Sequence, residues 1–94
     1  MTELTTEGRQ WRSDIKQCIA LSEAKSKDPT KILMFLRKQG FVAKTGHEMY
    51  IPKTVHKLKT MDYIKETKDA YVLTEKGKKE VEEYKNLPPY LLNG

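Results

Sequence analysis

The chain has 94 residues, of which 37% are hydrophobic and 33% charged, and its formal net charge is +5. This length predicts a single domain over residues 1–94, because two halves would each be too small to bury a core of their own. No apolar run approaches the roughly 18 residues of a membrane span, which argues against a membrane protein.

Residues suited to metal binding or catalysis are few. The only cysteine is Cys18 and the only histidines are His47 and His56. We therefore expect no metal site and no cofactor. No Ser/His/Asp set, paired-carboxylate pocket or glycine-rich phosphate loop is evident, so the chain is not expected to be an enzyme. A lone cysteine fits a reducing compartment, and the first residues lack the order of a secretory signal. The expected location is the cytoplasm, or the host cytoplasm or nucleoid if the protein is viral.

The excess positive charge lies in the middle third of the chain. Residues 29–61 carry seven basic side chains against Glu48 alone, whereas residues 1–28 are neutral and residues 62–94 carry one net negative charge. Charge segregation of this kind is typical of a surface that binds a polyanion.

The first two expected elements are helices. Apolar residues recur every three or four positions over residues 9–26, which predicts an N-terminal helix with Arg12 and Asp14 facing water. Asp28 and Pro29 form a helix start, because aspartate caps free amides and proline suits the first turn. A core helix is expected over residues 29–39.

Residues 41–61 are expected to form a helix-turn-helix whose last helix opens at Pro52. Val55, Leu58 and Met61 give this helix a core face, and its opposite face is basic. Residues 62–73 predict a β-hairpin, with strands at residues 63–65 and 70–73. Thr74 can cap a final helix over residues 75–86, which is followed by the apolar tail 87–94.

Three motifs carry a resemblance to a known family: Thr54-Val55-His56-Lys57-Leu58, Asp62-Tyr63-Ile64-Lys65 and Tyr71-Val72-Leu73-Thr74-Glu75-Lys76-Gly77. Residues 30–84 resemble the winged helix-turn-helix domains of small prokaryotic, archaeal and viral transcription regulators. The fold class this implies is mainly α with a small β-hairpin (α+β), a winged helix-turn-helix with an extra N-terminal helix. Asp62 stands where the family usually has glycine.

The resemblance implies a transcriptional regulator that binds double-stranded DNA with a recognition helix in the major groove and with the hairpin as a wing. The expected DNA-binding residues are Lys44, Lys53, Thr54, His56, Lys57, Lys59, Thr60, Lys65 and Lys68. The helix over residues 52–61 lacks the Arg, Asn and Gln side chains that make bidentate contacts to bases, so phosphate contacts are expected to dominate. Changing Lys53, Lys57 or Lys59 to Ala is expected to flatten the salt dependence of binding by about one unit each.

Two alternative functions remain open at this point. The same fold can serve as a protein–protein adaptor that binds an acidic partner surface, or as a non-specific nucleic-acid-binding protein. The chain is too short for a separate effector domain, so no small-molecule ligand is expected. A homodimer is expected, because such regulators often bind paired half-sites. The expected interface residues are Trp11, Ile15, Ile19, Tyr90, Leu91 and Leu92.

Overall fold

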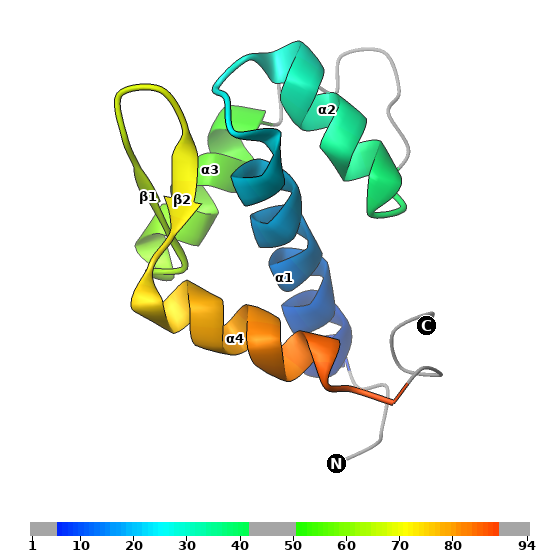
Figure 1. The fold of residues 1–94 in the computed structure, drawn as a ribbon. Coiled ribbons are helices and arrows are strands. Elements are labelled where there is room, and N and C mark those ends of the chain that lie inside the picture. Colours follow the sequence, from blue (N-terminus) through cyan, green and yellow to red (C-terminus); the bar gives the residue numbers. More distant parts are fainter. Residues whose placement is uncertain (1–5, 42–50, 89–94) are drawn as a thin grey trace.

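A computed structural model describes residues 6–41 and 51–88 of the chain. This part of the chain is mainly helical and carries one small antiparallel hairpin (Figure 1). The helices are α1 (Thr6–Ala24), α2 (Pro29–Lys38), α3 (Ile51–Thr60) and α4 (Glu75–Lys85), and the strands are β1 (Ile64–Glu66) and β2 (Tyr71–Leu73).

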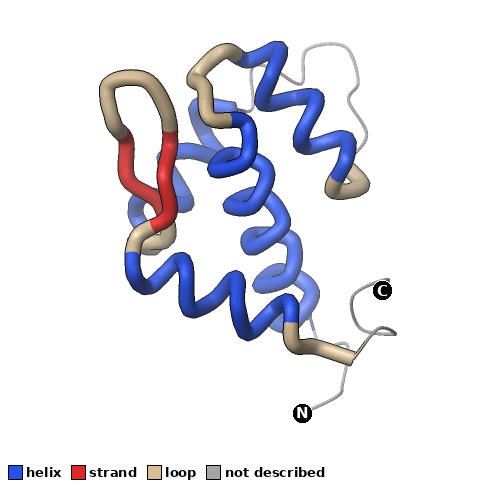
Figure 2. Tube along the Cα trace, in the orientation of Figure 1, coloured by secondary structure: helices blue, strands red, loops and turns tan. Residues whose placement is uncertain are grey.

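Helix α1 is the central element. It packs against α2, α3, α4 and β2, and both figures show it running through the middle, with α2 on one side and the hairpin on the other (Figures 1 and 2). The largest fully buried side chains come from α1, α2 and α3, and they are Ile15, Cys18, Leu21, Ile32 and Leu58. One continuous core therefore joins all the helices and the hairpin that the structure describes.

The starts and ends of the helices follow local chemistry. The Oδ1 atom of Asp28 accepts a hydrogen bond from the Thr30 amide at 3.0 Å, and Pro29 opens α2 as predicted. Gly40, with φ of 94°, ends this helix in the left-handed region that favours glycine. Helix α1 ends at Ala24, two residues before the predicted boundary, and Lys25 takes a left-handed φ of 50°.

The predicted solvent exposure of two α1 residues is wrong. Arg12 and Asp14 are only 4% and 2% exposed. The prediction assumed one apolar stripe and one wet face for this helix. Because four other elements pack around α1, polar positions beside the stripe are covered as well.

Thr74 and Gly77, in the motif that ends the hairpin, both make contacts at the junction between the hairpin and α4. Thr74 caps α4 by accepting a hydrogen bond from the Gly77 amide at 3.0 Å, and its own amide donates to the Tyr63 carbonyl at 3.0 Å. A Cβ atom at Gly77 would overlap that same carbonyl oxygen. Asp62, at the glycine position of the family pattern, has φ of 63°. The threonine and the glycine thus fix how the hairpin meets the last helix.

None of the helices in residues 6–41 and 51–88 is long and apolar enough to cross a membrane.

Candidate functional site

Helix α3 has one face in the core and an opposite face in solvent. Ile51, Val55 and Leu58 are buried, which matches the predicted core face. At 100° per residue, Lys53, His56 and Thr60 fall on the opposite side of the helix, and all three are exposed. Thr54 lies at the flank and is half-buried. Within the part of the chain that the structure describes, Lys53 has no ion pair.

Lys57 is held by a buried acid on α1. Its Nζ atom lies 2.6 Å from Oδ1 of Asp14, whose side chain is 3% exposed, whereas the Lys57 side chain is 43% exposed. The same Oδ1 accepts a hydrogen bond from Gln10 Nε2 at 2.9 Å. Lys57 therefore joins α3 to α1, in addition to any role on the basic face. Sequence spacing gives no sign of this pairing, because 43 positions separate the two residues.

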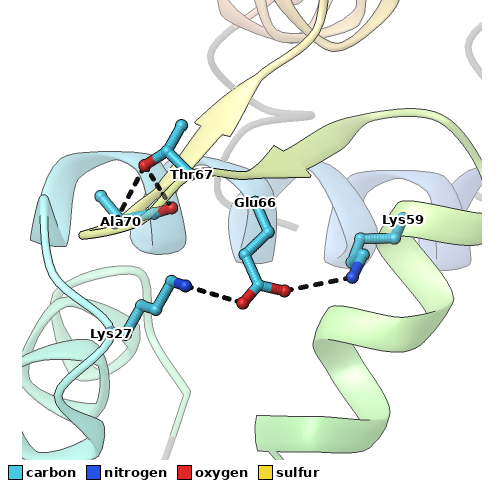
Figure 3. Close-up of polar contacts among 5 residues, drawn as sticks. All are labelled: Lys27, Lys59, Glu66, Thr67 and Ala70. Atoms are coloured by element: carbon cyan, nitrogen blue, oxygen red, sulfur yellow. Dashed lines mark hydrogen bonds and ion pairs between the residues drawn. The ribbon is translucent and has the colours of Figure 1, made fainter.

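A second acid comes to α3 from the hairpin. Glu66, the last residue of β1, lies between two lysines, with its Oε1 at 3.2 Å from Lys59 Nζ and its Oε2 at 2.7 Å from Lys27 Nζ (Figure 3). Hydrogen bonds from Lys27 and then Lys59 lower the pKa of the Glu66 carboxyl below its usual value. Lys27 also lies over the ring of Tyr71, 5.9 Å from its centroid. Lys27 lies outside the basic middle third of the chain, so the charge distribution along the sequence did not indicate it.

The hairpin presents its own lysines. Its strands pair antiparallel, with Lys65 opposite Val72. The Thr67 amide and hydroxyl both donate to the Ala70 carbonyl, at 2.8 and 2.9 Å, and so close the turn. Figure 3 shows the bond from the hydroxyl, together with the one that the hydroxyl accepts from the Ala70 amide at 3.1 Å. Lys65 and Lys68 are exposed, and neither has an ion pair within the described residues.

A shallow cavity separates α3 from β2 and the loop before α2. Its volume is about 350 Å³, and its walls include Lys27, His56 and Lys59 together with Tyr71. The cavity thus brings Lys27, from the loop before α2, together with Lys59 of α3. We use the name basic face for the exposed basic residues of α3, the hairpin lysines Lys65 and Lys68, and Lys27 taken together.

Half of the predicted dimer interface can be placed in the structure. Ile15 and Ile19 are 0% and 7% exposed within the core, so their assignment to an interface between subunits is wrong. The stripe that contains them packs against α1's own neighbours in the chain. Trp11 is half-buried and meets Tyr84 edge to face, with ring centroids 6.2 Å apart. The remaining predicted interface residues, 90–92, and Lys44 of the DNA-binding set lie outside the described residues.

No cluster of three or more His, Cys, Asp or Glu side chains that could hold a metal ion occurs in residues 6–41 and 51–88. Comparison of the chain with known family models, with curated proteins and with solved structures finds no match.

Proposed function

We propose that the chain is a winged helix-turn-helix protein that binds double-stranded DNA through its basic face. The observation that carries this proposal is the outer face of α3, where Lys53, His56 and Thr60 are exposed. The hairpin adds two exposed lysines, Lys65 and Lys68. A ten-residue helix is about 15 Å long and fits the major groove. The hairpin would then follow the adjacent backbone or minor groove.

Phosphate contacts supply most of the affinity in this proposal. Each lysine that neutralises a phosphate releases counterions, which makes the affinity depend on salt. The exposed face of α3 carries no Arg, Asn or Gln, so it lacks the side chains that read guanine or adenine by paired hydrogen bonds. Weak base discrimination, with sequence preference arising from DNA shape, follows from this composition.

The ion pairs within the chain change how much each lysine of α3 is expected to contribute to DNA binding. Lys57 and Lys59 are paired with acids, so binding DNA would redistribute these contacts, whereas Lys53 is ready to meet a phosphate. We therefore expect Lys53→Ala to flatten the salt dependence by about one unit and Lys57→Met or Lys59→Ala by less.

The Glu66 carboxylate occupies a position between two cations that a phosphate oxygen could also occupy. Both groups are oxyanions that accept charge-assisted hydrogen bonds from lysine. Glu66→Gln removes the negative charge and keeps the shape. This change should tighten binding to DNA several-fold and steepen its salt dependence, because Lys27 and Lys59 become free to pair with phosphates.

The test is the affinity for a random-sequence duplex, measured by fluorescence anisotropy from 20 to 200 mM salt for the wild type, Lys53→Ala and Glu66→Gln. Lys85→Ala, an exposed change at the end of α4 away from the hairpin, is the matched control. The proposal requires opposite shifts in Lys53→Ala and Glu66→Gln, with Lys85→Ala close to the wild type. A folded wild type that binds no duplex at 20 mM salt would refute it, and would favour an adaptor that binds an acidic protein. Equal affinity for duplex, single strands and RNA would instead identify a non-specific nucleic-acid-binding protein.

A further inference from the structure

A second basic site lies on another part of the molecule. A cavity of about 270 Å³ separates the first half of α1 from the turn that follows α2. Arg9, Arg12, Ser13 and Lys16 line it from α1, at the spacing of one helical face, and Gln39 and Phe41 line it from the turn. The cavity shares no lining residue with α3 or the hairpin.

The charges of this cavity are of one sign. Three of its lining side chains are cations, and none of those that the structure describes is acidic. Among the side chains described in residues 8–41 and 51–88, neither Arg9, Arg12 nor Lys16 forms an ion pair. Cations that gather on one helical face favour the binding of an anion.

Arg12 provides a second, independent observation. The residue is 4% exposed, and its buried Nη2 atom has no hydrogen-bond partner among the residues that the structure describes. Buried guanidinium groups in proteins are normally paired and hydrogen-bonded, because leaving a charged donor unsatisfied costs the full desolvation of that donor. Because Arg12 also lines the cationic cavity, a ligand that accepts hydrogen bonds and carries negative charge would satisfy this side chain.

We propose that this cavity binds a phosphate group. A guanidinium donates in a planar fork that matches phosphate oxygens, and Arg9 and Lys16 at the rim can add charge to balance a dianion. Ser13 and Gln39 offer neutral donors for the remaining oxygens. The volume lies near the lower end of ligand pockets, about 300–1,000 Å³, so the group would belong to a small molecule or to one phosphate of a nucleic-acid backbone.

The carboxyl-terminal end of α2 repels an anion in the cavity less than an uncapped helix end would. The carbonyls of Phe35, Leu36 and Arg37 accept hydrogen bonds from the amides of residues 39–41, at 3.0 to 3.2 Å. These bonds satisfy three of the last four carbonyls of α2, which are the groups that carry the negative end of the helix dipole.

The experiment titrates inorganic phosphate and methyl phosphate into ¹⁵N-labelled protein, against sodium chloride at matched ionic strength. We expect saturable shifts of amide signals in residues 9–16 and 39–41. Arg9→Gln and Lys16→Gln should each weaken the affinity about tenfold, the lower range for a charge-assisted hydrogen bond. Arg37→Gln, an exposed change on α2 outside the cavity, is the control and should bind as the wild type does. Arg12→Met tests the part played by the buried guanidinium. If this variant does not fold, Arg9→Gln and Lys16→Gln still test whether the cavity binds phosphate.

The source of the phosphate is resolved by a second arm. If the site takes a backbone phosphate, the double variant Arg9→Gln/Lys16→Gln loses duplex affinity and salt dependence. If the site takes a free phosphate, duplex affinity stays unchanged in that variant while methyl phosphate binding is lost. Absence of saturable shifts up to 50 mM phosphate, or equal weakening by Arg37→Gln, would overturn the proposal. Since Lys53→Ala leaves the cavity intact, its phosphate binding should be that of the wild type even if the chain binds no DNA.

Discussion

The ion pair between Lys57 and Asp14 makes a sharp prediction about stability. Lys57→Met removes the charge that faces a carboxylate only 3% exposed and keeps most of the apolar stem. Asp14 then has Gln10 as its remaining hydrogen-bond donor among the described residues. An uncompensated buried carboxylate destabilises the folded chain and not the unfolded one.

The magnitude follows from burial on the two sides of the pair. Removing one partner of a fully buried pair costs about 3–5 kcal/mol. The Lys57 side chain is 43% exposed, so water reaches one end of the pair, and we expect a loss of about 2 kcal/mol. For a domain of this size, that loss lowers the melting temperature by about 8–16 °C. Lys53→Ala, at an exposed position without an ion pair, should change the free energy of unfolding by less than about 0.5 kcal/mol.

Urea unfolding followed by circular dichroism measures both variants, together with Asp14→Asn/Lys57→Met. The double variant removes both charges at once, and we expect it to recover more than half of the loss. If Lys57→Met were as stable as Lys53→Ala, the pairing of Lys57 with α1 would have no energetic role. A double variant less stable than Lys57→Met would show that the buried carboxylate is not the cause of the loss.

Three further predictions concern stability. Gly77→Ala should lower the free energy of unfolding, measured in urea, by about 1–3 kcal/mol, because the added Cβ meets the Tyr63 carbonyl. Lys78→Ala, at the next position, should leave that free energy nearly unchanged. Lys25→Gly should raise the free energy of unfolding by about 0.5–1 kcal/mol, because glycine adopts the left-handed φ of 50° without strain. A melting temperature no higher than that of Lys25→Ala would contradict this. Burial raises the pKa of the Cys18 thiol to about 12, so the folded thiol keeps its proton between pH 9 and 12 while the unfolded thiol loses it. The free energy of unfolding should therefore fall over this range, by up to about 1.4 kcal/mol per pH unit from this group, and fall less steeply in Cys18→Ala; equal slopes would contradict the assignment.

Local signals in the sequence predicted the elements well. Asp28 with Pro29, and Thr74 at the start of α4, act through neighbours within three residues, so their roles are visible in the sequence itself. The hairpin was predicted from its two short β-rich runs, and the structure pairs Ile64 with Leu73 and Glu66 with Tyr71. These predictions depend on local chemistry, which tertiary packing left unchanged.

Contacts between distant segments could not be read in the same way. The burial of Asp14 and its pairing with Lys57 depend on how α1 and α3 pack, and 39 positions separate Lys27 from Glu66. The stripe of α1 was correctly predicted to be apolar, but periodicity alone does not say whether a stripe meets the chain's own core or a second subunit. Ile15 was therefore assigned to an interface when it lies in the core.

The most direct test of the basic face is a map of the DNA contact on the protein. A short random-sequence duplex is titrated into ¹⁵N-labelled protein at low salt, and the amide shifts are assigned residue by residue. We predict that the largest shifts lie on α3 around Lys53, His56 and Thr60 and on the hairpin around Lys65 and Lys68. Shifts confined to α4, or none for a folded protein at low salt, would contradict DNA binding by this face.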